Sequence, residues 1–272
     1  MTQISIFGCG WLGLPLAKAL LENGFTVNGS TTSDEKLSVL KNLGIQAFQI
    51  ELSETKIQGE VDSFLENSKI VIIDIPPKLR GISKENFVSK IKNLIPFIEK
   101  STVENVLFIS STSVYGEDNL EVTEETELNP DTESGKQLVQ TEQLLQSNSK
   151  FKTTILRFGG LIGEDRHPIK FLAGTKNIEN PNAPINLIHQ DDCIGIILEI
   201  LRQAQNDKWN KKETFNAVAP FHPSRKDYYT QKAIEFNLAL PEFNSENLTF
   251  GKTILSDKVE NVLEYTFAKP NL

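Results

Sequence analysis

Cysteine is scarce in this sequence. Only Cys9 and Cys193 occur among the 272 residues, and they stand far apart along the chain. Two cysteines are too few for the disulfide framework of a small secreted protein. We therefore expect both thiols to be reduced, as they are in a cytoplasmic protein.

The chain also lacks long apolar runs and an excess of positive charge. No apolar stretch approaches the roughly 20 residues needed to span a bilayer, and the N-terminus has no basic segment of the kind that begins a signal peptide. The formal net charge is −8 and the isoelectric point is about 5.1. Such a charge repels nucleic acid and anionic lipid at long range, so we expect a cytoplasmic protein that binds neither.

What the chain does contain is a regular alternation of short apolar runs with amphipathic stretches, up to about residue 217. This alternation predicts an α/β fold with a doubly wound parallel sheet. The run Ile70–Ile73 is apolar at every position, which indicates a strand buried on both faces. The predicted strands are Gln3–Phe7, Phe25–Asn28, Ile45–Gln49, Ile70–Ile75, Val106–Ser110, Thr153–Arg157 and Thr214–Ala217. The predicted helices are Leu12–Asn23, Asp34–Leu43, Ser83–Lys100, Glu133–Gln146 and Asp191–Gln203.

Two later segments break the alternation and are richer in proline, asparagine and phenylalanine. We expect them to form a small C-terminal α+β lobe over the carboxyl ends of the strands, where open α/β sheets bind ligands. The predicted domains are residues 1–160 with 188–217 for the sheet, and residues 161–187 with 218–272 for a substrate lobe.

A glycine-rich loop lies between the first predicted strand and the first predicted helix. Its pattern is Gly8-x-Gly10-x-x-Gly13, the fingerprint of a dinucleotide-binding Rossmann fold when it occurs in this context. The glycines allow a tight turn, a close approach of pyrophosphate and close helix packing, and the helix N-terminus attracts phosphate. The alternative is a fold that has kept the loop without the ligand. The predicted cofactor contacts in this loop are Gly8, Gly10, Trp11, Leu12 and Gly13.

The end of the second predicted strand bears on the choice between NAD and NADP. An acid about 20 positions after the first glycine commonly bonds the ribose 2′-hydroxyl of NAD, but no carboxylate occurs here before Asp34. The hydroxyl groups in this segment can donate to a 2′-phosphate, so the sequence favours NADP over NAD, although it offers no arginine there. The alternative is that these hydroxyls only cap the next helix. The predicted contacts are Ser30, Thr31 and Thr32.

A third candidate contact follows the buried strand, in Asp74-Ile75-Pro76-Pro77. The prolines hold the backbone extended at the expected ligand edge, and we assign Ile75 and Pro76 to the cofactor site. A purely structural turn is the alternative.

Four further segments carry a family resemblance. They resemble, in the same order along the chain, segments of the extended short-chain dehydrogenase/reductases, the NAD-dependent epimerase/dehydratase group. The segments are Phe108–Gly116, Leu156–Gly163, Leu187–Asp192 and Thr214–Val218.

This resemblance implies a role for particular residues. Ser111 matches the serine that hydrogen-bonds the reacting hydroxyl or carbonyl, and Lys136 matches the lysine that holds the cofactor ribose and lowers the pKa of a catalytic tyrosine. Tyr115 matches a tyrosine that packs beside the ligand, and it is the candidate for a substitute acid. Phe158 and Gly159 lie in the segment beside the nicotinamide. No metal site is implied.

The catalytic tyrosine of that family is absent. Thr132 stands in its place, four residues before Lys136, a spacing that predicts both side chains on one helix face. A threonine hydroxyl titrates far too high to act as an acid near neutral pH. The glycine spacing also differs from the GxxGxxG usual in extended members. Both departures resemble an atypical, YeeZ-like subgroup, which keeps the fold and the cofactor site without the tyrosine.

Two functional hypotheses follow. The first is an NAD(P)-dependent oxidoreductase or epimerase that acts on a small carbonyl or sugar-like molecule. The second is a catalytically inactive NAD(P)-binding sensor or scaffold protein. Arg166, His167 and Lys170 could face the substrate or form a solvated loop. The resemblance also implies a homodimer through the helix at Glu133–Gln146.

Overall fold

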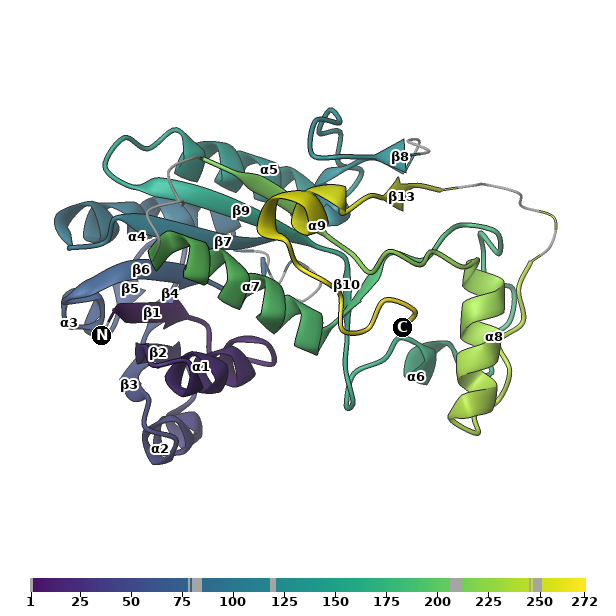
Figure 1. The fold of residues 1–272 in the computed structure, drawn as a ribbon, viewed down its shortest axis with the longest axis horizontal. Coiled ribbons are helices and arrows are strands. Elements are labelled where there is room, and N and C mark those ends of the chain that lie inside the picture. The colour runs from purple at the N-terminus through teal and green to yellow at the C-terminus, as the bar shows by residue number, and fades with distance from the viewer. Residues whose placement is uncertain are drawn as a thin grey trace.

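A seven-stranded parallel sheet forms the centre of the molecule (Figure 1). The computed structural model describes residues 2–77, 79, 85–117, 121–205, 212–244, 246 and 251–272. The strand order is β12-β9-β7-β6-β1-β2-β3. It reverses between β1 and β6, which is where open sheets of this kind bind ligands. The strands are β1 (Gln3–Phe7), β2 (Thr26–Thr31), β3 (Gln46–Gln49), β6 (Ser68–Ile73), β7 (Asn105–Ser111), β9 (Lys152–Phe158) and β12 (Thr214–Ala217).

Helices cover both faces of this sheet, as the sequence predicted. On one face lie α1 (Gly13–Glu22), α2 (Asp34–Asn42), α7 (Gln190–Gln205) and α9 (Asp257–Leu263), and on the other α3 (Val61–Leu65), α4 (Phe87–Lys100) and α5 (Glu133–Gln146). The five predicted helices are confirmed, Glu133–Gln146 with the predicted ends and the other four with shifted ends. Helix α4 begins at Phe87 because the Asn86 side chain caps it by accepting from the Ser89 amide at 2.8 Å, and part of the predicted start at 83 lies outside the described residues. No helix among the described residues is long and apolar enough to cross a membrane.

Strand β6 shows why the sheet is buried on both sides. Ile70 and Ile72 pack into the core beneath α1 and α7, whereas Val71 and Ile73 pack into the core beneath α4 and α5. Successive side chains of a strand point to opposite faces, so an unbroken apolar run serves both cores. All four side chains are buried.

Short elements complete the fold, and the sequence pattern did not predict most of them because they are too brief to show a periodicity. Three two-stranded pairs lie outside the main sheet. They are β4 (Glu51–Leu52) with β5 (Ile57–Gln58), β8 (Glu121–Val122) with β13 (Thr253–Ile254), and β10 (Gly160–Ile162) with β11 (Leu187–His189).

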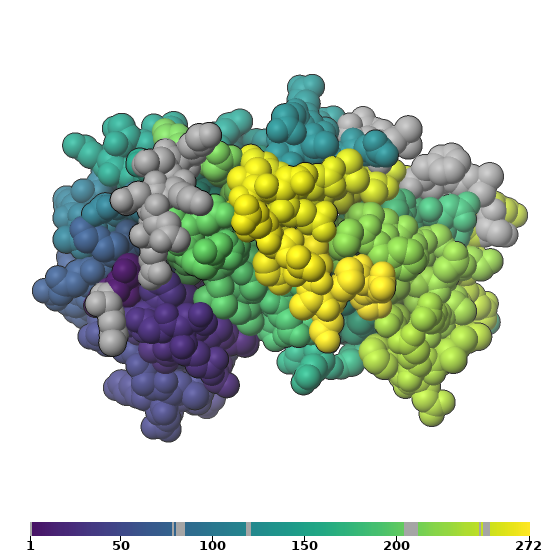
Figure 2. Space-filling view, in the orientation of Figure 1, coloured from purple at the N-terminus to yellow at the C-terminus, as the bar shows by residue number. Residues whose placement is uncertain are grey.

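A small lobe stands at the end of the molecule opposite α1 and α2 (Figure 1). It contains α6 (Ile169–Leu172) and α8 (Arg225–Glu235), and it has its own hydrophobic cluster. Part of the predicted lobe segment 218–272 lies outside this lobe, because α9 packs with α7 and β12 in the core of the sheet. Figure 2 shows these C-terminal residues at the surface between the sheet and α8.

His167 belongs to the core of this lobe and does not face solvent. Its Nδ1 accepts a hydrogen bond from the Ile169 amide at 3.1 Å, so the proton of the neutral ring is on Nε2, which lies 2.9 Å from the Tyr228 hydroxyl. Burial, with Lys232 and Lys170 adding to it, lowers the pKa of His167 to about 4. The histidine is therefore neutral at physiological pH.

We expect this lowered pKa to make the protein less stable in acid. The pKa of His167 is about 4 in the folded protein, against 6.5 for an ordinary histidine. The free energy of unfolding that depends on this difference is fully present above pH 6.5. It is lost as the pH falls from 6.5 to 4, by an amount on the order of 2 kcal/mol. His167→Asn keeps an acceptor for the Ile169 amide but cannot titrate, so thermal unfolding followed by circular dichroism should show a smaller loss between pH 7 and 4.5.

His189→Gln is the matched control, because His189 lies outside the lobe core and is partly exposed. This variant should still lose stability between pH 7 and 4.5, because His167 is intact. Equal slopes for His167→Asn and the wild type would contradict the account.

Candidate functional site

The glycine loop is held tightly against the end of β6. Gly8 has a φ of +101°, which side chains disfavour, and a Cβ atom there would lie 2.3 Å from the Asp74 carbonyl oxygen. A Cβ at Gly13 would lie 2.1 Å from the Gly8 carbonyl oxygen. Both positions therefore require glycine for reasons internal to the fold.

Gly10 differs from these two glycines. Among the described residues other than its two chain neighbours, no atom lies within 4 Å of the place where its Cβ would be, and its backbone does not have positive φ. The protein itself thus gives no reason for a glycine at this exposed position. Space kept open beside the N-terminus of α1 is what a bound pyrophosphate requires, so the loop fits a dinucleotide.

The carboxyl group of Asp74 lies beneath this loop. The Gly13 amide hydrogen-bonds to it, and a Cβ at Gly13 would lie 3.1 Å from its Oδ2 atom. Burial raises the pKa of Asp74 to about 8, and the hydrogen bond from Gly13 acts in the opposite direction. The raised pKa favours the neutral form of this carboxyl group, which places less negative charge beneath the loop.

The contrast between the two glycines gives a prediction about stability. Gly13→Ala forces a methyl group against backbone that cannot yield, and such overpacking costs roughly 1–3 kcal/mol. For a chain of this size each kcal/mol lowers the melting temperature by about 2–4 °C. Gly10→Ala should leave it unchanged, because the methyl group enters open space.

Differential scanning calorimetry of both variants measures the difference directly. Equal losses of melting temperature in the two variants would show that Gly10 is also constrained by packing.

The hydroxyl groups after the loop have unequal environments. Ser30 is buried, and its Oγ accepts a hydrogen bond from the Gly8 amide at 3.1 Å. Thr31 is also buried, and its Oγ1 accepts from the Ser33 amide at 3.2 Å. Thr32 is exposed. Ser30 thus holds the loop in place, and Thr32 presents its hydroxyl to solvent at the end of β2.

A lysine that the sequence pattern did not single out follows these hydroxyls in the chain. Lys36 lies in the first turn of α2, where its amide donates to the Ser33 carbonyl. Burial raises the pKa of the Cys9 thiol to about 12, Asp74 adds to this, and the Lys36 charge acts in the opposite direction. Lys36 is therefore within electrostatic reach of the glycine loop.

Ser111 and Lys136 come from β7 and α5, which meet at one edge. Ser111 caps the short helix η1 (Thr112–Val114), and its Oγ accepts from the Ser113 amide at 3.2 Å. A Cβ at Gly135 would lie 2.3 Å from the Ser113 carbonyl oxygen, so the first turn of α5 packs directly on the segment that follows Ser111. The Ser111 hydroxyl still has its own hydrogen to donate, and Lys136 is exposed.

Thr132 does not lie on the face of α5, and the structure corrects that expectation. The helix begins at Glu133, and Thr132 is the capping residue before it, with extended backbone. Its side-chain oxygen accepts a hydrogen bond from the Gly135 amide at 3.1 Å. Threonine is favoured at this position because its oxygen satisfies an amide that has no partner within the helix.

Tyr115 lies in the core, where its hydroxyl has two partners. It donates to Asn216 Oδ1 at 2.8 Å and accepts from Arg157 Nη1 at 2.6 Å. Burial raises the pKa of Tyr115, and Arg157 acts against the rise. Arg157 in turn forms a buried ion pair with Glu142 at 2.6 Å. These contacts hold the phenol away from solvent, and Tyr115 is only 1% exposed.

The remaining predicted contacts differ in exposure. Leu12 and Phe158 are buried in the core next to α1. The backbone of Gly159 lies close to Asn186, because a Cβ at Gly159 would be 2.6 Å from the Asn186 carbonyl oxygen. Ile75 lies beside Gly8, and Pro76 is exposed. Because the Leu12 side chain is buried, this residue can meet a ligand at the loop only through its backbone.

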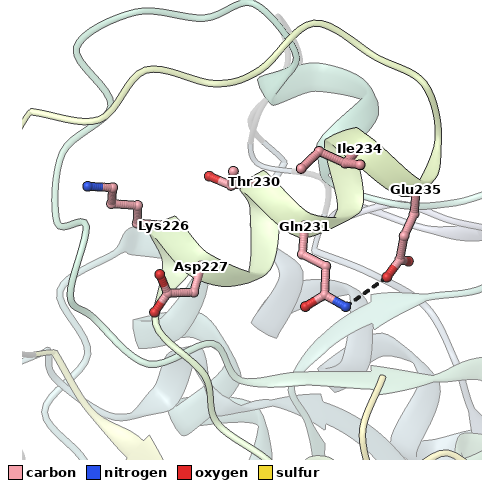
Figure 3. A pocket seen from close by; sticks show the side chains of 6 residues that line it. All are labelled: Lys226, Asp227, Thr230, Gln231, Ile234 and Glu235. Atoms are coloured by element: carbon pink, nitrogen blue, oxygen red, sulfur yellow. Dashed lines mark hydrogen bonds between the residues drawn. The ribbon is translucent and has the colours of Figure 1, made fainter.

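A surface pocket of about 480 Å³ lies elsewhere, along α8 (Figure 3). None of the predicted site residues lines it. Its walls come from one helix alone: Lys226, Asp227, Thr230, Gln231, Ile234 and Glu235. We assign no function to it.

The loop, the sheet order and the open position at Gly10 together define an NAD(P)-binding protein of the Rossmann type. A model of the NAD(P)H-binding family matches residues 8–201, and the chain belongs to that family.

Over its full length the chain is 31% identical to Protein YeeZ of Escherichia coli (strain K12), and the alignment covers 97% of that protein. The chain is thus a homologue of YeeZ, as the subgroup resemblance implied.

Solved structures show the same fold. A functionally unknown conserved protein from Silicibacter pomeroyi matches with a TM-score of 0.79 and 20% identity, covering 100% of this chain and 95% of that one. UDP-glucuronic acid 4-epimerase from Bacillus cereus, solved in complex with NAD, matches with a TM-score of 0.77 and 18% identity, covering 98% and 94%. The predicted doubly wound Rossmann fold is therefore confirmed.

Proposed function

We propose that this protein is an NADP-dependent oxidoreductase or epimerase that acts on a small carbonyl or sugar-like substrate. The observation that carries the proposal is the open space at Gly10, beside two glycines that the fold itself requires. The loop and the N-terminus of α1 would hold the pyrophosphate, and Ser111 and Lys136 at the edge formed by β7 and α5 would serve the nicotinamide end.

Two residues at that edge carry the chemistry. The Ser111 hydroxyl donates to the oxygen of the substrate, which stabilises negative charge as it develops. Lys136 holds the ribose hydroxyls of the cofactor. The bound nicotinamide supplies hydride transfer, and water supplies the proton because Thr132 is not a suitable acid and the Tyr115 hydroxyl is engaged in the core. The substrate contacts come from the small lobe that contains α6 and α8.

Lys36 and the hydroxyl groups at the end of β2 support NADP as the cofactor. A lysine binds phosphate as a point charge, and Lys36 follows Thr32 by four residues, at the start of α2. The 2′-phosphate distinguishes NADP from NAD, so a cation here acts on one cofactor only.

We expect Lys36→Met to weaken NADPH binding about tenfold, the loss of one charged hydrogen bond, and to leave NADH binding unchanged. Isothermal titration calorimetry with both cofactors measures the effect. Lys41→Met is the control, because Lys41 is exposed in the last turn of the same helix. Tighter binding of NADH than of NADPH by the wild-type protein would refute the assignment of NADP.

A second candidate function is an NAD(P)-binding protein without turnover. The hydrogen bonds of the Tyr115 hydroxyl with Asn216 and Arg157 favour it, because they engage the candidate substitute acid within the core. On this view Ser111 and Lys136 are remnants of an ancestral site.

Turnover separates the two candidates. We expect the wild-type protein to consume NADPH with a panel of small aldehydes, ketones and keto sugars. Ser111→Ala should lower kcat about 10²–10³-fold, the usual effect of removing one donor to a developing oxyanion, with cofactor affinity unchanged. Ser147→Ala, at the far end of α5, is the control.

Cofactor binding without consumption by the wild-type protein across this panel would support the second candidate. So would equal rates for the wild type and Ser111→Ala.

A further inference from the structure

A tight turn of the small lobe closes onto the glycine loop. Gly163 and Arg166 join their backbones through two hydrogen bonds, of 2.8 and 3.2 Å. The turn lies against Trp11, the loop residue that follows the open position at Gly10. A Cβ at Gly163 would lie 2.9 Å from the indole ring, so the glycine allows the turn to contact Trp11 directly.

Trp11 is fixed by three polar contacts. Its Nε1 donates to Asp165 Oδ1 at 2.8 Å, and the Arg166 guanidinium lies over its ring at 4.9 Å from the centroid. The side chain of Gln190, the first residue of α7, donates a hydrogen bond to the Trp11 carbonyl at 2.7 Å. The indole is thus a fixed platform that joins the loop to the lobe.

Among the residues that the structure describes, the charge of Arg166 has no acidic partner. None of the ion pairs formed by the described residues includes it, although the chain carries a net charge of −8. The Asp165 carboxylate next to it is bound to Trp11 instead. Arg166 is exposed, so its guanidinium is available to an anion from solution.

Two observations indicate that Arg166 can bind a phosphate group at the glycine loop. A guanidinium that stacks on an aromatic ring keeps its N–H groups in its own plane, where they can grip phosphate oxygens in pairs. In addition, Arg166 and Asp74 both act on the pKa of the buried Cys193 thiol, in opposite directions. Arg166 therefore lies within electrostatic reach of the region beneath the loop.

We propose that the turn Gly163–Arg166 is a clamp on the bound dinucleotide, in which Arg166, stacked on Trp11, donates hydrogen bonds to the pyrophosphate. This inference rests on the proposed cofactor site at the glycine loop. It makes the small lobe part of cofactor binding, because the turn connects β10 to α6.

The test compares binding of NADPH and of ADP-ribose, which has the pyrophosphate but neither the nicotinamide nor the 2′-phosphate. Arg166→Met keeps the length of the side chain and removes the charge, and it should weaken both ligands about tenfold. The salt dependence of binding should also become shallower, because one phosphate contact is lost. Arg166→Lys should recover only part of the affinity, since an ammonium lacks the planar fork. Lys226→Met on α8 removes the same charge far from the loop and should bind as the wild type does.

Unchanged affinity for both ligands in Arg166→Met would overturn the clamp, and so would a loss confined to NADPH, which would place Arg166 at the nicotinamide or at the 2′-phosphate instead of the pyrophosphate. NADPH binding by the Gly10→Val variant distinguishes a failure of the clamp proposal from a failure of the proposed function. If the wild-type protein binds NADPH and Gly10→Val does not, the cofactor site stands whatever Arg166 does. If Gly10→Val binds as the wild type does, the cofactor site itself is wrong.

Discussion

The contact between the glycine loop and the end of β6 is the constraint on which the rest of the site depends. Gly8 passes so close to the Asp74 backbone, and Gly13 so close to Gly8, that neither can carry a side chain. This packing fixes where α1 begins and directs its N-terminus toward the point at which the strand order reverses. The position of Gly10 follows from it, since the loop can turn there only over open space. Parallel α/β sheets bind their ligands at this point.

The charges around the loop also suit the binding of an anionic cofactor. A chain with a net charge of −8 must bind a cofactor that is itself an anion. The buried carboxyl group of Asp74 avoids direct repulsion by a raised pKa. Lys36 at one side of the loop and Arg166 at the other add positive charge, in our proposals at the 2′-phosphate and at the pyrophosphate respectively. The unfavourable field of the whole protein is thus offset locally.

The sequence predicted the central sheet well because its signals are long or chemically specific. Alternating apolar runs indicate strands, and the continuous run Ile70–Ile73 indicated a strand between two cores. The sequence failed where a single local hydrogen bond decides the outcome. Thr132 became a helix cap because the amide of Gly135 needed a partner, and His167 entered the lobe core because the Ile169 amide and the Tyr228 hydroxyl enclose it. The return of α9 to the sheet depends on packing between distant segments, which no short window of sequence reveals.

The central claim is that a dinucleotide binds across the loop with its pyrophosphate over Gly10. A crystal structure of the protein with NADPH tests this most directly. The account predicts pyrophosphate density at the N-terminus of α1, within hydrogen-bond distance of the backbone amides from Gly10 to Gly13, and with Trp11 still held by Asp165. Density for the nucleotide at another surface, or a loop that has moved to fill the space at Gly10, would contradict it.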